Sequence, residues 1–146
     1  LMNATFHIRN AKKDDFVYIY ESLQLVYQDL QQEEFQKKIN IIIKKKKSWI
    51  LVAENQYNKK IGFIISQNVN LINFKYQTLI ITDFFINPKF RELKVADILY
   101  QELEQKAKEN EFNEILVMCN INSTTTQNFY LKYKFKYNKK NYVKQI

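Results

Sequence analysis

The sequence has very few of the residues that build disulfide frameworks, glycine-rich loops or metal sites. Its 146 residues include one cysteine (Cys119), one glycine (Gly62), one proline (Pro88) and one histidine (His7). A single cysteine excludes an internal disulfide and favours a reducing compartment. His7 and Cys119 fall in predicted strands without partners at metal-ligand or nucleophile spacing, so both are interpreted as structural and no metal site is predicted.

Long apolar runs are also missing. The longest one is far too short to cross a bilayer, and no signal-peptide pattern opens the sequence. A hydrophobic content of 46%, with 15% aromatic residues, excludes a disordered chain. The length suits a single domain spanning residues 1–146. We therefore expect one cytoplasmic domain with no membrane partner.

The formal net charge of +8 comes almost wholly from lysine, because Arg9 and Arg91 are the only arginines. Lys, Asn and Ile share A/T-rich codons, so nucleotide bias accounts for much of this charge. The run Lys44–Lys47 is interpreted as the solvated end of a predicted helix. A nucleic-acid partner would rest on charge alone, since no recognition motif accompanies it, and is not expected.

The stretch Ile80–Phe112 carries most of the functional signal. A nearly unbroken apolar run ends at Asn87-Pro88, as expected of a buried strand, because proline cannot donate to a ladder. Apolar residues then recur at helical spacing, at Leu93, Ala96, Tyr100, Leu103 and Ala107. The free N–H groups at such a helix start, beside Lys89 and Arg91, would suit a phosphate.

Periodicity predicts the remaining elements in chain order. Strands are expected at about residues 5–9, 49–53, 61–65, 76–86 and 115–119, with a closing hairpin at 135–137 and 141–143. Helices are expected at about residues 14–30, 33–43 and 91–110, followed by a short helix capped by Ser123. This order predicts an α/β (or α+β) fold, with a mixed sheet and helices on both faces.

Several segments in register resemble the GNAT superfamily of acyl-CoA N-acyltransferases. The order strand, Asn-Pro, aromatic-Arg and helix is similar to its acyl-CoA-binding motif, Arg/Gln-x-x-Gly-x-Gly/Ala. Thr82–Ile86 resembles the Glu-Asp-Phe-Phe-Val strand of the diamine and spermidine acetyltransferase branch, and Ile8–Ala11 resembles the first strand. Asn128–Phe135 is similar to the Phe-Tyr-x-x-x-Gly-Phe segment. The resemblance implies a mostly antiparallel sheet whose central parallel pair splays apart.

The resemblance also implies acetyl-CoA as acyl donor, an amine as acceptor, and roles for particular residues. Tyr130 would be the general acid to the leaving thiolate. The cofactor-binding residues would be Phe84, Phe85, Ile86, Arg91, Glu92, Leu93, Lys94, Val95, Ala96, Asp97, Asn122 and Ser123. The first two helices would wall the acceptor site and offer Tyr20, Tyr27, Glu21, Asp29, Glu33 and Glu34.

The sequence departs from the family pattern at its glycines and at its base. Glu92, Lys94 and Ala96 stand where glycine is usual or common in the pyrophosphate loop, and Lys134 fills a further glycine position. Thr82 replaces the strand glutamate and cannot accept a proton at neutral pH. Asp83 follows it, but strand alternation points Asp83 to the opposite face unless a bulge turns it.

Two functions follow from these observations. The first is an N-acetyltransferase that uses acetyl-CoA and a primary amine (polyamine, small amine or protein amine), with a water held near Thr82 and Asp83 as the base. The second is a catalytically impaired member of the same fold that serves as a binding or assembly module. A homodimer is kept as an alternative to a monomer.

Overall fold

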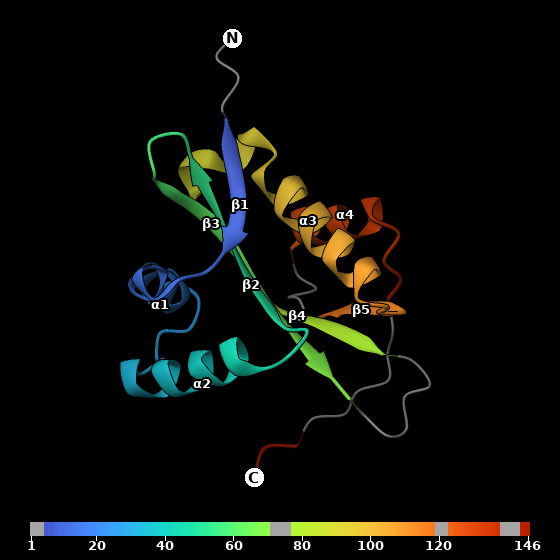
Figure 1. Cartoon of the computed structure of the whole chain (residues 1–146), viewed down its shortest axis with the longest axis horizontal. Helices are drawn as coiled ribbons and strands as arrows, with labels where there is room; N and C mark the ends of the chain where they lie inside the picture. Colours follow the sequence, from blue (N-terminus) through green and yellow to red (C-terminus); the bar gives the residue numbers. More distant parts are fainter. Residues whose placement is uncertain (1–4, 71–76, 119–122, 138–143) are drawn as a thin grey trace.

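A five-stranded sheet in the order β1-β2-β3-β4-β5 organises the computed structural model of this chain (Figure 1). The structure describes residues 5–70, 77–118, 123–137 and 144–146, without the side chain of Glu92. The strands are β1 (Phe6–Asn10), β2 (Trp49–Asn55), β3 (Lys60–Val69), β4 (Thr78–Ile86) and β5 (Glu114–Val117). The helices are η1 (Lys13–Asp15), α1 (Phe16–Gln24), α2 (Gln32–Lys44), η2 (Pro88–Leu93), α3 (Val95–Glu109) and α4 (Thr124–Lys132).

Neighbouring strands are antiparallel except for β4 and β5, which are parallel and joined through α3. This confirms the predicted mixed sheet with its parallel pair, because such a pair needs a crossover connection. β4 is flanked by β3 and β5, as predicted. The predicted closing hairpin is not seen in the described part: residues 135–137 are not in a strand, and 141–143 lie outside the described residues.

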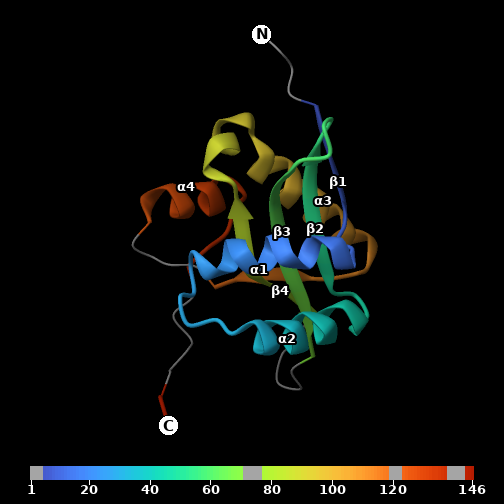
Figure 2. The same cartoon turned by 90° about the vertical axis from the view of Figure 1, so that its left-hand side faces the viewer.

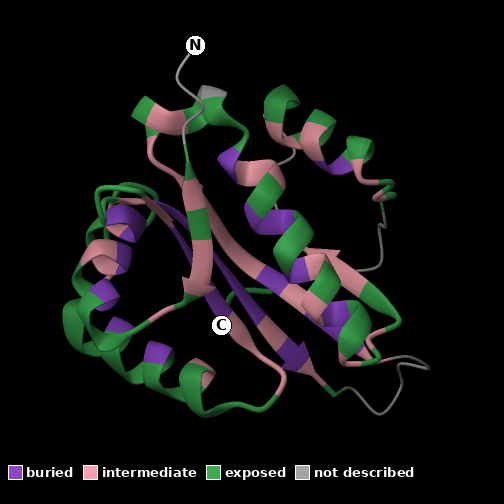
Figure 3. Cartoon of the chain, turned by 45° about the horizontal axis from the view of Figure 1, so that its top comes forward, coloured by how far each residue is buried: buried purple, intermediate pink, exposed green. Residues whose placement is uncertain are grey.

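Helices cover both faces of the sheet, as Figures 1 and 2 show. On one face, α3 packs on β2, β3 and β4 through Val95, Leu99, Tyr100, Leu103 and Ala107. On the other face, α1 and α2 pack on β2 and β3 through Phe16, Ile19, Leu23, Phe35 and Ile39. In Figure 3 the buried residues lie on the strands and on the sheet-facing sides of the helices. We refer to these as the α3-side core and the α1/α2-side core.

The helix after β4 begins later than predicted, at Val95 rather than Arg91. Pro88 starts the short helix η2, and the Asn87 side chain accepts a hydrogen bond from Lys89 N at 3.1 Å. Lys94 then adopts a left-handed backbone (φ 57°), which separates η2 from α3. As a result Leu93 lies outside α3 and is exposed, while Val95 occupies the first buried position.

A buried ion pair anchors the start of α1 to the sheet. Asp15 is fully buried and accepts two hydrogen bonds from Arg9, at 2.7 and 2.9 Å, and its side chain makes no capping hydrogen bond to α1. Arg9 also reaches Glu54 of β2 at 2.6 Å, and Lys60 of β3 lies 3.3 Å from Asp15. Burial opposes ionisation of Asp15, but the bonds from Arg9 and from the backbone of Lys12 outweigh it and lower its pKa.

Arg9→Ala should lower the free energy of unfolding at pH 7 by about 3 kcal/mol, because it leaves a buried carboxylate without its main partner. The pKa of folded Asp15 is depressed, so this contribution is complete above about pH 4 and is lost as the pH falls further. Urea unfolding at pH 7 and pH 3 measures the difference, which should shrink at pH 3. The control is Arg91→Ala, at an exposed position, which should change stability by less than about 0.5 kcal/mol. Equal losses in the two variants would contradict the role of the ion pair.

Candidate active site

A β-bulge in β4 decides which side chains face α1 and α2. Ile65 of β3 pairs with Asp83, but the next residue, Ser66, pairs with Ile81, so Thr82 is an extra residue. Ile81 belongs to the α3-side core, and so does Phe84, three residues later. Regular alternation would have pointed Asp83 to that same face. The bulge instead turns Asp83 towards the α1/α2 side, beside Thr82.

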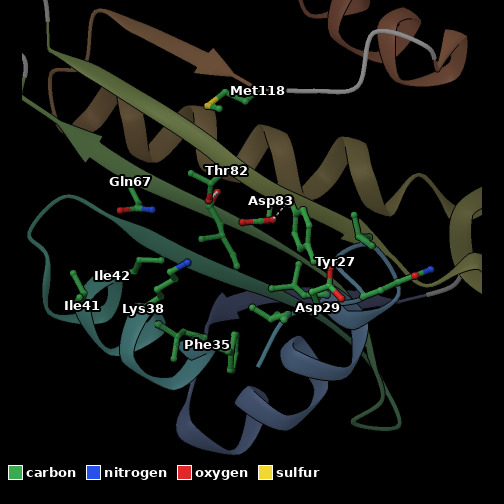
Figure 4. A pocket seen from close by; sticks show the side chains of 16 residues that line it. Tyr27, Asp29, Phe35, Lys38, Ile41, Ile42, Gln67, Thr82, Asp83 and Met118 are labelled. Carbon is green, nitrogen blue, oxygen red and sulfur yellow. Dashed lines mark hydrogen bonds between the residues drawn. The ribbon is translucent and has the colours of Figure 1, made fainter. Parts of the chain in front are cut away.

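Thr82 and Asp83 line a cavity of about 1270 Å³ between β4, the α1–α2 connection and α2 (Figure 4). Its described walls are mostly apolar and carry two carboxylates, Asp29 and Asp83, and one ammonium, Lys38. The complete described lining is Leu23, Val26, Tyr27, Gln28, Asp29, Leu30, Phe35, Lys38, Ile39, Ile41, Ile42, Ile65, Gln67, Thr82, Asp83 and Met118. Such a concave, mostly apolar site with few polar groups is typical of small-molecule binding.

A hydrogen bond across the cavity fixes Asp83. The Tyr27 hydroxyl donates to Asp83 Oδ1 at 2.9 Å, as the dashed line in Figure 4 shows. Burial and the adjacent carboxylate both raise the pKa of Tyr27, so its phenol stays protonated at neutral pH. One oxygen of Asp83 is thereby held by the phenol, while the other is left to accept a proton or a hydrogen bond from a bound molecule.

Of the six substrate-side residues expected from the sequence, the structure brings Tyr27 and Asp29 to the cavity. Tyr20 packs against Phe35 with its ring centroid at 5.3 Å, and its hydroxyl donates to Leu30 O at 3.1 Å. Glu33 is exposed on α2 and pairs with Lys37 at 3.1 Å. The sequence also missed much of the apolar lining, because Ile41, Ile42 and Met118 carry no chemical signature.

The parallel pair separates at the cavity. β4 and β5 pair from Thr78↔Glu114 to Ile81↔Val117 and no further in the described residues. From Asp83 to Ile86, β4 pairs with β3 on its other side only. Among the described residues, its backbone groups facing away from β3 therefore form an open strand edge that an extended ligand arm could pair with.

The side chains of the predicted binding strand point to both faces. Phe84 packs on the α3 side against Phe129, with ring centroids 5.7 Å apart. Phe85 stacks on Phe63 at 5.6 Å on the opposite face. Gly62 lets β3 approach this segment closely, since a Cβ there would lie 2.7 Å from both Phe85 O and Ile86 Cδ1. Phe85 O therefore faces β3, and the open edge is formed by the backbone groups of β4 that point away from β3.

The start of α3 is a candidate anion-binding site, which we call the anion seat. The first N–H groups of a helix have no partner inside the helix, and no side chain in the described residues caps α3 at Lys94. The side chain of Val95 is fully buried and that of Ala96 half-buried, so these two residues offer their backbone groups here. Arg91 and Lys94 are exposed cations beside them. Such a helix start fits a phosphate group. The side chain of Glu92 lies outside the described residues.

Asp97 points towards α4 instead of towards the anion seat. It is ion-paired with Lys132, and it accepts a hydrogen bond from the Tyr133 hydroxyl at 2.5 Å. Burial opposes its ionisation, but these bonds outweigh it and lower the pKa of Asp97. Burial and the same carboxylate raise the pKa of Tyr133 to about 12. The side chain of Asp97 therefore ties α3 to α4.

Tyr130 is buried on α4, between Phe129 at 5.4 Å and Phe135 at 5.1 Å. Ser123 caps this helix as predicted, accepting from Thr126 N at 3.3 Å. Asn122 and Cys119 lie outside the described residues. Tyr130 belongs to an aromatic cluster that packs on α3, which accounts for the fixed position of its ring.

Two of the substituted glycine positions need a left-handed backbone. Lys94 has φ 57° and Lys134 has φ 66°. Glycine adopts this region without steric cost, whereas a residue with a Cβ is disfavoured there. The structure thus explains why glycine is usual at both positions, and lysine makes each of them strained.

Two absences concern only residues that the structure describes. None of those helices is both long and apolar enough to cross a membrane. Among the described residues, no group of three or more His, Cys, Asp or Glu side chains is arranged to hold a metal ion.

The chain matches a known family over most of its length. Residues 9–135 match the model of the acetyltransferase (GNAT) family. No curated protein matches the chain significantly in sequence.

Solved structures share the fold at low identity. A transcriptional regulator from Bacillus halodurans C-125 has a TM-score of 0.85 and 16% identity, over 97% of this chain and 100% of that chain. The aminoglycoside N-acetyltransferase AAC(6')-Iy, bound to a CoA bisubstrate analogue, has a TM-score of 0.84 and 14% identity over 98% and 99%. Glucosamine-6-phosphate N-acetyltransferase from Arabidopsis thaliana has a TM-score of 0.71 and 19% identity over 97% and 98%.

Lys134→Gly and Lys94→Gly should each raise the free energy of unfolding by about 0.5–1 kcal/mol, because relief of left-handed strain outweighs the greater entropy of unfolded glycine. Urea unfolding measures the change. The control is Lys37→Gly, in the middle of α2, which should instead lower stability by about 1 kcal/mol. Destabilisation by all three substitutions would contradict the assignment of strain.

Proposed function

The chain belongs to the acetyltransferase (GNAT) family, and we propose that it transfers an acetyl group from acetyl-CoA to a primary amine held in the cavity beside Asp83. The observation that carries this proposal is the bulge at Thr82. The bulge returns a carboxylate to the acceptor side of β4, where the sequence alone had left a threonine. A carboxylate beside the point where β4 and β5 part suits deprotonation of an ammonium ion.

The donor side is supported by the open edge of β4 and the uncapped start of α3. Acetyl-CoA supplies the activated acetyl group when bound. We assign its pyrophosphate to the N–H groups from Val95 onwards, with Arg91 and Lys94 as nearby cations. Its amide-bearing arm would pair with the backbone groups of β4 that point away from β3 between Asp83 and Ile86.

The acceptor side gives each residue one task. Asp83, directly or through one water, takes the proton that the attacking ammonium must lose. Tyr27 keeps Asp83 oriented by donating to its other oxygen. The amine nitrogen then forms a bond to the acetyl carbon as the carbon–sulfur bond breaks, and Tyr130 donates a proton to the leaving thiolate. The nitrogen loses its second proton to solvent as the carbon–sulfur bond breaks, and Tyr130 regains its proton from solvent. The ammonium thus gives up two protons and the sulfur gains one.

The resemblance to the diamine and spermidine branch supports an amine as the acceptor, and we infer nothing more specific from it. The alternative function, a binding module without turnover, is favoured by lysine at the strained position 94. Acetyl-CoA binding without acetylation of any polyamine, small amine or peptide amine would support that alternative.

Asp83→Asn should lower kcat by roughly 10²–10⁴-fold, because asparagine retains the bond from Tyr27 but cannot accept the proton. Release of free CoA thiol measures the rate. The control is Arg91→Ala, which should weaken acetyl-CoA binding roughly tenfold, as measured by calorimetry, and leave kcat nearly unchanged. Undiminished kcat in Asp83→Asn would show that another group is the base.

Tyr130→Phe should also lower kcat by roughly 10²–10⁴-fold while retaining the melting temperature and acetyl-CoA affinity, since the buried ring is kept and only the hydroxyl is lost. With an acetyl thioester whose leaving thiol has a lower pKa than CoA, the difference in kcat between Tyr130→Phe and the wild type should be smaller, because that thiolate needs less protonation as it leaves. Tyr57→Phe, at a residue that is 78% exposed, serves as the matched control and should change nothing. Full activity of Tyr130→Phe would remove it from the mechanism.

A further inference from the structure

We propose that the acceptor is a small monoamine with an apolar alkyl or aryl body, not a polycationic amine. This inference rests on the proposed function and specifies the substrate class of the same site. It is carried by the walls of the cavity and by the number of charges that the cavity offers.

The cavity walls present apolar side chains that no other part of the described chain covers. Val26 is 61% exposed, Ile41 64% and Met118 70%, although all three line the cavity. Val26 lies in the α1–α2 connection, Ile41 on α2, and Met118 directly after β5, so the three side chains border the cavity from three directions. Figure 4 shows Phe35, Ile41 and Ile42 on the α2 side and Met118 across β4. A ligand with a hydrocarbon body would cover this apolar surface and be stabilised by its burial.

The carboxylates of the cavity can match at most two ammonium groups, fewer than a polyamine or an aminoglycoside carries. Its described lining holds two carboxylates, Asp29 and Asp83, against one ammonium, Lys38. Lys38 is itself paired with Glu34 at 2.6 Å, and Glu33 pairs with Lys37, so these two helix acids are already engaged. The segments outside the described residues contain neither Asp nor Glu in their sequence.

A polyamine or aminoglycoside carries several positive charges at neutral pH. Each charge that enters an apolar cavity without a carboxylate partner loses hydration without compensation. Asp83 and Asp29 lie with Tyr27 on the side of the cavity away from Ile41 and Ile42 (Figure 4). A monoamine would therefore bind with its nitrogen at Asp83 and its hydrocarbon body along α2.

The decisive experiment compares acetylation of butylamine, pentylamine and hexylamine with that of spermidine, kanamycin and a short peptide with a free N-terminus. Each added methylene should lower KM roughly fourfold, the equivalent of about 0.8 kcal/mol for one buried methylene. Hexylamine should exceed the other three classes in kcat/KM by at least about tenfold. A flat dependence on chain length, or faster acetylation of spermidine, kanamycin or the peptide, would overturn the inference.

Calorimetric binding of the same amines in the presence of CoA separates this inference from the proposed function. Binding that strengthens with chain length, without any turnover, would support the apolar amine site and contradict the acetyltransferase function. No binding of hexylamine would overturn the inference itself.

A pair of substitutions on α2 tests the position of the apolar body. Ile41→Ser should raise the KM for hexylamine roughly tenfold and leave the KM for acetyl-CoA unchanged, because Ile41 lines the cavity. Ile43→Ser is the control: Ile43 is also exposed on α2 but does not line this cavity, and its substitution should change neither value. Equal effects of the two substitutions would contradict the proposed placement.

Discussion

One extra residue in β4 is the constraint on which the proposed acceptor site depends. Without the bulge at Thr82, strand alternation would send Asp83 into the α3-side core, where an ionised carboxylate is strongly disfavoured. With it, Asp83 enters the cavity, while Phe84 still packs against the aromatic cluster of α4 and Phe85 against Phe63. The same strand therefore supplies a carboxylate to one face and completes the apolar packing of both.

The opposite wall of the cavity depends on how α1 and α2 are held on the sheet. Arg9 and Asp15 fix the start of α1 to β1, and the α1/α2-side core holds both helices against β2 and β3. The connection between the two helices then brings Tyr27 within hydrogen-bond distance of Asp83, 56 residues away in sequence. The buried ion pair thus helps to hold Tyr27 in its position beside Asp83.

Much of the fold was readable from the chain because the signals were local. Apolar periodicity predicted the strands and α2 to within a few residues, and Ser123 was identified as a helix cap from its position alone. The start of α3 was misplaced by four residues because Lys94 gives no sign of a left-handed backbone. Glycine there would have marked the boundary.

By itself, the sequence predicted the order of β1 to β5 and of the main helices, the strand–loop–helix unit around Asn87-Pro88, and the resemblance to the family to which the chain belongs. Only the tertiary structure decided which candidates line the cavity. It brought Tyr27, Asp29, Thr82 and Asp83 together there, and it left Tyr20 and Glu33 elsewhere. The reason is that backbone preference and periodicity act over a few residues, whereas a bulge is defined by the register between two strands. Register depends on partners distant in sequence, so the direction of Asp83 emerges only when β3 and β4 are paired.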